Sequence, residues 1–227
     1  MMRMNLRFAG SVVPAGILCA RLLAAEPASS TNSAAKEPGA PPAGAVLLWN
    51  GRDLAGWSGF FTNAGVDLAK LWQVKDGALW LAGKPLGYLR TDNVYSNYHA
   101  HVEWRWPATN GNSGVFVHMH KPDALWPASV ECQLKSGAAG EMIGHGGVDF
   151  PGPLINGKKR AKIATASEKP AGQWNSYDIY CRASAIDTTV NGVHQQHIES
   201  VTVSSGGVGL QLEGFPVEFR NLWLAPL

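Results

Sequence analysis

The sequence predicts an all-β domain, either an antiparallel β-sandwich or a jelly roll. Beyond residue 45, apolar and polar residues alternate with period two, and Gly, Asn-Gly and Asp-Gly turn sequences bound the alternating stretches. The 26 glycines and 14 prolines are typical of short strands joined by tight turns. Helical periodicity is not sustained, although one short turn is expected over residues 67–71.

The expected strands follow one another in chain order. Residues 71–74 and 78–81 form a hairpin, because Asp76-Gly77 between them can adopt the positive φ of a primed turn. The other strands are expected over residues 87–91, 98–106, 115–120, 129–135, 176–183, 188–190, 208–212 and 217–224. In a sandwich of this kind, one layer can curve and offer a concave face.

Residues 1–25 are expected to be a signal peptide. Arg3 and Arg7 are followed by a mostly apolar stretch and then by Leu23-Ala24-Ala25, which suits a signal peptidase. The stretch is too short for a permanent membrane span. We therefore predict an exported protein, periplasmic or extracellular. Cys19 follows a poor imitation of a lipoprotein signal, and the sequence does not tell whether it is lipidated.

The domain organisation follows from composition. Residues 26–44 are rich in Pro, Ala, Ser and Gly and predict a flexible linker, so the folded domain is expected over residues 45–227. The net charge of +2, with scattered Lys and Arg, does not indicate a nucleic-acid partner. Cys132 and Cys181 are both expected to point into the core, as two separate thiols or, alternatively, as a disulfide.

Three expected strands carry a row of polar residues on one side and an apolar row on the other, since residues i and i+2 of a strand share a face. A solvated outer face would also show this pattern. These rows, however, are rich in the planar polar groups that hold sugar hydroxyls. They contain Glu103 and Arg105, then Glu131 and Gln133, then Gln211 and Glu213, and the nearby Trp126 and Phe116 could stack on a sugar ring.

Several short motifs occur in a fixed order between residue 45 and the C-terminus. They are L-W-N-G-R-D-L-A-G-W at 48–57, W-Q-V-K-D-G at 72–77, E-W-R at 103–105, N-S-G-V at 112–115, E-C-Q at 131–133, G-L-Q at 209–211 and F-R-N-L at 219–222. In this order they resemble the 3-keto-disaccharide hydrolase domain family, also described as a 3-keto-glucoside lyase and hydratase domain. The resemblance implies a concanavalin A-like jelly-roll sandwich of two antiparallel sheets with a concave polar face.

The resemblance also implies a chemistry. The substrates would be small oligosaccharides or glycosides whose glucose unit carries a ketone at C3. A base would remove the acidified proton on C2, the group on C1 would leave by β-elimination, and water would add back, which amounts to hydrolysis. No nucleotide cofactor is needed for this step. The protein must supply a base, an acid and electrostatic stabilisation.

The resemblance assigns site residues by position. Glu131 is expected to be the base or a metal ligand, and Glu103 the second carboxylate, paired with Arg105; a purely structural salt bridge of Arg105 stays open. Substrate-binding residues are expected to be Gln133, Asn112, Ser113, His118, Gln211, Glu213 and Trp126. His118 stands where family members often carry Arg, so a cationic role there requires a protonated or metal-bound imidazole.

One departure from the family pattern bears on which residue is the base. The family commonly reads Gln-x-His-Gly near its end, whereas this chain has Glu213 in place of the histidine. The loop over residues 144–162 is expected to shape the substrate pocket, with His145 as an ordinary loop histidine. Glu131, Glu213 and His118 are candidate ligands for a divalent Mn, Zn or Ca ion, although their spacing matches no known metal motif.

Two other functions remain open on the same fold. One is a lectin-like carbohydrate-binding module without catalysis, because fold alone does not give function. The other is an ordinary glycoside hydrolase, which would need Glu103 and Glu131 about 5 to 5.5 Å or about 6.5 to 9.5 Å apart.

Overall fold

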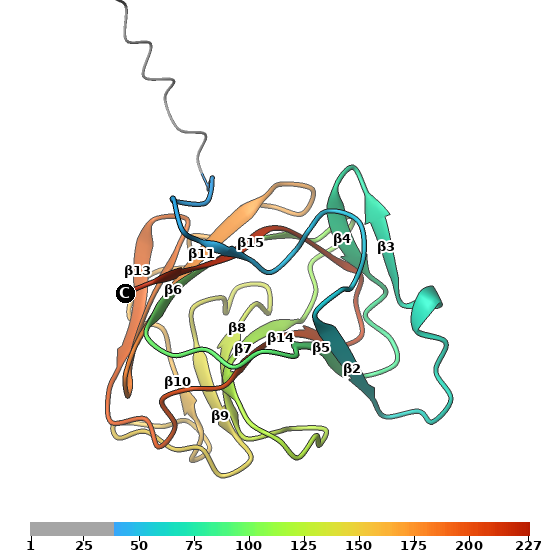
Figure 1. The fold of residues 1–227 in the computed structure, drawn as a ribbon. Helices are drawn as coiled ribbons and strands as arrows, with labels where there is room; N and C mark the ends of the chain where they lie inside the picture. The colour runs from blue at the N-terminus through green and yellow to red at the C-terminus, as the bar shows by residue number, and fades with distance from the viewer. Residues whose placement is uncertain (1–38) are drawn as a thin grey trace, which may run out of the picture. The chain divides into compact units, whose positions relative to one another are not determined.

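The computed structural model describes residues 39–227, which form two antiparallel β-sheets (Figure 1). The larger has eight strands, in the order β13 (Val193–Ile198), β12 (Ala185–Val190), β11 (Asn175–Arg182), β6 (Tyr98–Arg105), β15 (Val217–Pro226), β4 (Ala78–Leu81) and β3 (Trp72–Lys75), with β1 (Val46–Leu47) paired to β15. The smaller has seven, in the order β10 (Lys159–Arg160), β9 (Met142–His145), β8 (Ser129–Gln133), β7 (Gly114–Met119), β14 (Gly207–Leu212), β5 (Gly87–Thr91) and β2 (Trp57–Phe61). The predicted all-β fold is confirmed.

One hydrophobic core fills the space between the sheets. The apolar rows predicted for three strands all belong to it, namely Tyr98, Ala100, Val102 and Trp104 of β6, Val130 and Cys132 of β8, and Val208, Leu210 and Leu212 of β14. Because side chains alternate along a strand, the polar rows of these strands must face away from the core. Cys132 and Cys181 are both buried and unbonded, as two separate thiols.

The predicted strands are all present, with small shifts at their ends. The hairpin turns at Asp76 and Gly77, which both have positive φ, and the expected helical turn is the 3-10 helix η1 (Leu68–Lys70). Five strands were missed, β1, β2, β9, β10 and β13. They are either very short or, like β13 with its sequence V-H-Q-Q-H-I, show no clean alternation.

The predicted signal peptide, Cys19 and most of the predicted linker lie outside the described residues. The remainder of that linker contacts the larger sheet, where Trp223 donates its indole N–H to the carbonyl oxygen of Gly39 over 2.8 Å. Between residues 39 and 227, no helix has the length and apolar character needed to cross a membrane.

Candidate functional site

The polar rows lie on opposite outer faces of the sandwich. Glu103 and Arg105 are on β6 of the eight-stranded sheet, whereas Glu131 and Gln133 are on β8 of the seven-stranded sheet. Each row points away from the core that the two sheets share. The prediction that these residues form one polar face is therefore wrong, because sheet membership is decided by long-range pairing that the local pattern does not contain.

On the seven-stranded sheet, Glu131 forms a buried pair with His145. The Nε2 atom of His145 and the Oε2 atom of Glu131 are 2.6 Å apart, and the two residues are 7% and 2% exposed. The prediction of an ordinary loop histidine is wrong, since His145 ends strand β9, which pairs with β8. The other carboxylate oxygen of Glu131 is buried and has no hydrogen-bond partner among the described residues.

A glycine makes room for the Glu131 carboxylate. Gly114 begins β7, the neighbour of β8, and a Cβ placed on it would lie 2.5 Å from the free oxygen of Glu131. The carboxylate therefore lies over the bare backbone of Gly114. Any side chain at this position would displace it from where it meets His145.

Gln211 lies on the other side of Gly114. Leu210 of β14 pairs with Val115 of β7, so the next residue, Gln211, lies beside Gly114. Gln211 is 1% exposed, and within residues 39–227 neither its amide nitrogen nor its amide oxygen has a hydrogen-bond partner. Buried polar groups are usually paired, so the unpaired amide of Gln211 is a candidate to hydrogen-bond a ligand or a water molecule.

The other predicted substrate-binding residues near Glu131 differ in whether their polar atoms already have hydrogen-bond partners. Ser113 donates its hydroxyl to the Gln211 carbonyl over 2.7 Å, which ties β7 to β14. The amide oxygen of Gln133 accepts the backbone N–H groups of Leu134 and Lys135, so it holds the end of its own strand. Asn112 keeps a buried amide oxygen without a partner in the described part of the chain. Only Asn112 of these three is free to contact a ligand through its oxygen.

Glu213 is a half-buried carboxylate just beyond β14. Burial raises its pKa, and the negative charge of Glu131 raises it further. Glu213 lines a cavity of about 630 Å³ together with Lys84 and Gly214. A carboxyl group with a raised pKa is suited to donate a proton.

Trp126 is the exposed aromatic residue of this face. It is 37% exposed and stacks on His145, with ring centroids 5.0 Å apart, and both line a recess of about 390 Å³ that the predicted 144–162 loop helps to form. Phe116 packs edge-on against His145 from a fully buried position, so it is not a platform. The loop that carries Trp126 is fastened by Asp123, which accepts hydrogen bonds from Tyr88 and Arg90 over 3.1 and 3.2 Å.

His118 does not join this group. It has positive φ at a register shift between β7 and β14, and its ring lies edge-on to Tyr98, a core residue. Its Nδ1 atom is 3.2 Å from the Val203 carbonyl oxygen, and burial lowers its pKa to about 4, which leaves the ring neutral near pH 7. The prediction that His118 acts beside Glu131 as a cation or ligand is wrong.

The predicted metal site therefore loses one of its three ligands. Within residues 39–227, no group of three or more His, Cys, Asp or Glu side chains is arranged to hold a metal ion. Glu131 is already paired with His145. The residues predicted for a Mn, Zn or Ca ion do not fit one as they are arranged.

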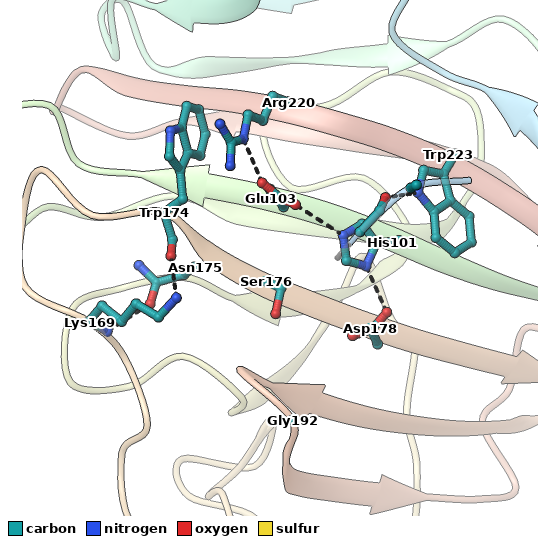
Figure 2. Close-up of a pocket in the computed structure, with 12 residues that line it drawn as sticks. His101, Glu103, Lys169, Trp174, Asn175, Ser176, Asp178, Gly192, Arg220 and Trp223 are labelled. Atoms are coloured by element: carbon teal, nitrogen blue, oxygen red, sulfur yellow. Dashed lines mark hydrogen bonds and ion pairs between the residues drawn. The ribbon is translucent and has the colours of Figure 1, made fainter. Parts of the chain in front are cut away.

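The other outer face contains Glu103 in a network of charged groups (Figure 2). Arg220 and Asn221 donate to Glu103 over 2.5 and 2.8 Å, and His101 donates to Asp178 over 2.8 Å. Burial opposes the charge of Glu103, but its contacts with His101, Asn221 and Arg220 outweigh burial and lower its pKa to about 2.

Arg105 pairs with Glu218 of β15, not with Glu103 as predicted. Its guanidinium also lies over the ring of Trp174, 4.7 Å from the centroid. Arg105 is thus part of a structural salt bridge across two neighbouring strands, the alternative that the sequence left open.

Comparison with known proteins gives a family match over nearly the whole described chain. The sequence model of the family described as the 3-keto-alpha-glucoside-1,2-lyase-like domain matches residues 44–225. No curated protein sequence matches the chain significantly.

Solved structures share the fold. A protein from Parabacteroides distasonis ATCC 8503, described provisionally as a glycosyl hydrolase, superimposes with a TM-score of 0.60 at 21% identity, covering 81% of this chain and 94% of that one. The β-glucanase of Bacillus licheniformis gives 0.56 at 13% identity, with 82% and 100% covered. The carbohydrate binding module CBM66 from Bacillus subtilis gives 0.53 at 11% identity, with 74% and 93% covered. At these identities the likeness shows the jelly-roll fold alone.

Proposed function

The chain belongs to the family of 3-keto-alpha-glucoside-1,2-lyase-like domains, and we propose that it is an exported enzyme that cleaves the glycosidic bond of 3-keto-glucosides. Membership of the family supports a carbohydrate-active role. The observation that carries the finer proposal is the buried Glu131–His145 pair beside a partly exposed tryptophan. The substrate is a small oligosaccharide or glycoside.

The first step is removal of the C2 proton, which is acidic because it lies next to the C3 ketone. In our proposal His145 takes this proton through Nδ1, the ring nitrogen that Glu131 does not engage. Glu131 fixes the orientation of the ring through Nε2 and balances the positive charge that the ring acquires. Such a pair is effective because the carboxylate is buried, where opposite charges interact strongly.

The electrons left on C2 are shared with the ketone oxygen as an enediolate. The Gln211 amide is the group proposed to donate a hydrogen bond to that oxygen, because its nitrogen is buried and otherwise unpaired. The bond between C1 and the glycosidic oxygen then breaks, and Glu213 gives that oxygen its proton. The raised pKa of Glu213 keeps more of it protonated at a given pH.

The elimination leaves the free aglycone and a sugar with a double bond between C1 and C2. Water then adds a hydroxyl to C1 and a proton to C2, which restores the 3-keto sugar and makes the net reaction a hydrolysis. Trp126 is proposed to stack on the sugar ring, since it is exposed next to His145.

The test replaces each member of the pair by glutamine. Glu131→Gln and His145→Gln should each lower the rate on a 3-keto-disaccharide by a factor of about 100 to 10,000, because both remove the proton acceptor or its charge partner. Glu103→Gln, which alters a carboxylate of equal length on the opposite face, should retain the rate. If either pair variant cleaved at the wild-type rate, the proposed base would be wrong.

The substrate comparison separates the competing functions. The wild-type protein should cleave a 3-keto-disaccharide and leave the unoxidised disaccharide intact, and deuterium at C2 should slow the reaction. Equal cleavage of both sugars would indicate an ordinary glycoside hydrolase. Binding of both without cleavage would indicate a lectin-like module.

A further inference from the structure

A second cavity, of about 750 Å³, lies on the outer face of the eight-stranded sheet (Figure 2). It is lined by side chains of β6, β11 and β15, with Trp174 at one end, Trp223 at the other, and the backbone of Gly39 and Ala40 beside it. The cavity is on the opposite side of the shared core from Glu131 and His145. Its size is within the range of ligand sites, about 300 to 1,000 Å³.

The floor of this cavity is held rigidly by charged contacts. Asp178 accepts hydrogen bonds from His99 and His101 through one carboxylate oxygen, each over 2.8 Å. Glu103 is held by Arg220 and Asn221. Groups that are fixed before a ligand arrives lose little conformational entropy on binding.

Several polar groups in the cavity still have hydrogen-bonding capacity. In the described chain, the second oxygen of Asp178, the hydroxyl of Ser176 and the terminal nitrogens of Arg220 make no side-chain hydrogen bond. The Nε2 atom of His101 is buried without a hydrogen-bond partner, because its distance of 3.7 Å to Glu103 is too long. The cavity thus offers donors and an acceptor close together.

The charges of the cavity favour a neutral ligand. Lys169, Arg220 and His101, whose raised pKa of about 9 keeps it protonated near pH 7, share the cavity with Glu103 and Asp178, so an anion would also meet carboxylates and a cation would also meet basic groups. A ligand with many hydroxyls can use donors and acceptors at once. Trp174 adds an aromatic side chain at one end, and the guanidinium carbons of Arg105 and Arg220 lie over its ring, 4.7 and 4.2 Å from the centroid, which fixes the ring in place.

From these observations we propose that the cavity is a second, non-catalytic site that binds a neutral, unoxidised oligosaccharide by contact with Trp174 and hydrogen bonding to Ser176, Asp178 and Arg220. The site would hold the protein on a glycan while Glu131 and His145 act on another sugar. It does not depend on the proposed 3-keto chemistry.

The test measures binding of maltotriose, cellotriose and laminaritriose to the folded protein by titration calorimetry. At least one of these probes should bind, and Trp174→Ala should weaken that binding about tenfold or more. Trp80→Ala is the matched control. Trp80 is partly exposed on the same outer face, and the Nζ atom of Lys75 lies over its ring, 4.1 Å from the centroid, but Trp80 does not line the cavity. It should leave binding unchanged.

Two further variants keep the result decisive. Ser176→Phe fills the cavity from β11 while keeping the hydrogen bond that the backbone N–H of residue 176 donates to the Asn191 side-chain oxygen, so it should block binding even if Trp174→Ala does not fold. Trp126→Ala should retain binding. The proposal is overturned if none of the three sugars binds, or if binding is lost in Trp126→Ala and kept in Trp174→Ala and Ser176→Phe. Turnover of a 3-keto-disaccharide should be unchanged in Trp174→Ala, which separates this site from the catalytic one.

Discussion

Replacing Gly114 with alanine tests whether the position of the Glu131 carboxylate matters for the reaction. Gly114 is not among the residues with positive φ, so alanine fits its backbone. The added Cβ would lie 2.5 Å from the Oε1 atom and 2.6 Å from the Cγ atom of Glu131. Ordinary contacts between such atoms are about 3.5 Å or longer. The Glu131 side chain must therefore move by about 1 Å.

That movement is large compared with the contact it disturbs. The Glu131–His145 bond is 2.6 Å long, so a displacement of about 1 Å is enough to spoil either its length or its direction. A misplacement of about 1 Å can lower a rate about 100-fold. The extra methyl group in a packed position should also lower the free energy of unfolding by about 1 to 3 kcal/mol.

The assay compares kcat on a 3-keto-disaccharide and the melting temperature with those of Gly207→Ala. That control adds the same methyl group on β14 of the same sheet, where its nearest atom would be the Cγ of Arg90 at 3.3 Å. Combining Gly114→Ala with Glu131→Gln should add little further loss of rate, because both changes act on one contact. Wild-type kcat in Gly114→Ala would refute the reasoning.

Three other predictions follow from separate parts of the molecule. Asp123→Asn should raise KM about tenfold at nearly constant kcat, because Asp123 fastens the loop that carries Trp126; an unchanged KM in steady-state kinetics would contradict this. Burial favours the neutral form of His101, but Asp178 and the nearby Glu103 outweigh burial and raise the His101 pKa to about 9. Protonated His101 therefore stabilises the fold fully below about pH 6.5, and this contribution is lost as the pH rises through 9. The difference in melting temperature between wild type and His101→Gln should shrink over that window, and a difference independent of pH would count against it. Export predicts a mature N-terminus between residues 26 and 45 by intact-mass analysis, which a stable cytoplasmic product retaining residue 1 would exclude.

The fold was largely predictable because its evidence is local. Alternation shows which side of a strand is apolar, and the core contains the predicted side of β6, β8 and β14. The hairpin at Asp76-Gly77 was predictable for the same reason, since its turn needs only two residues. Strands with no alternation, such as β9, left no such local signal.

The site was only partly predictable because it depends on contacts between distant segments. Glu131 and Trp126 could be selected by residue type, but the partner of Glu131 is 14 residues away on a strand that was not expected. The prediction for His118 failed for a different reason. A shift in the register between β7 and β14, with positive φ at His118, sends its ring toward Tyr98 although the alternation alone would place it beside Phe116.

The separation of Glu103 from Glu131 bears on the competing hydrolase mechanism. Packed sheets are about 10 Å apart, and these two side chains point away from each other on opposite sheets, so their carboxylates are farther apart than the roughly 9.5 Å that an inverting glycosidase allows. They cannot act on one glycosidic bond. Glu213 is near enough for the charge of Glu131 to raise its pKa, so a two-carboxylate mechanism on this fold would have to use Glu131 with Glu213. In that arrangement His145 would have no role in removing a C2 proton. Slowing of the reaction by deuterium at C2 would therefore distinguish the proton-abstraction mechanism from a two-carboxylate mechanism.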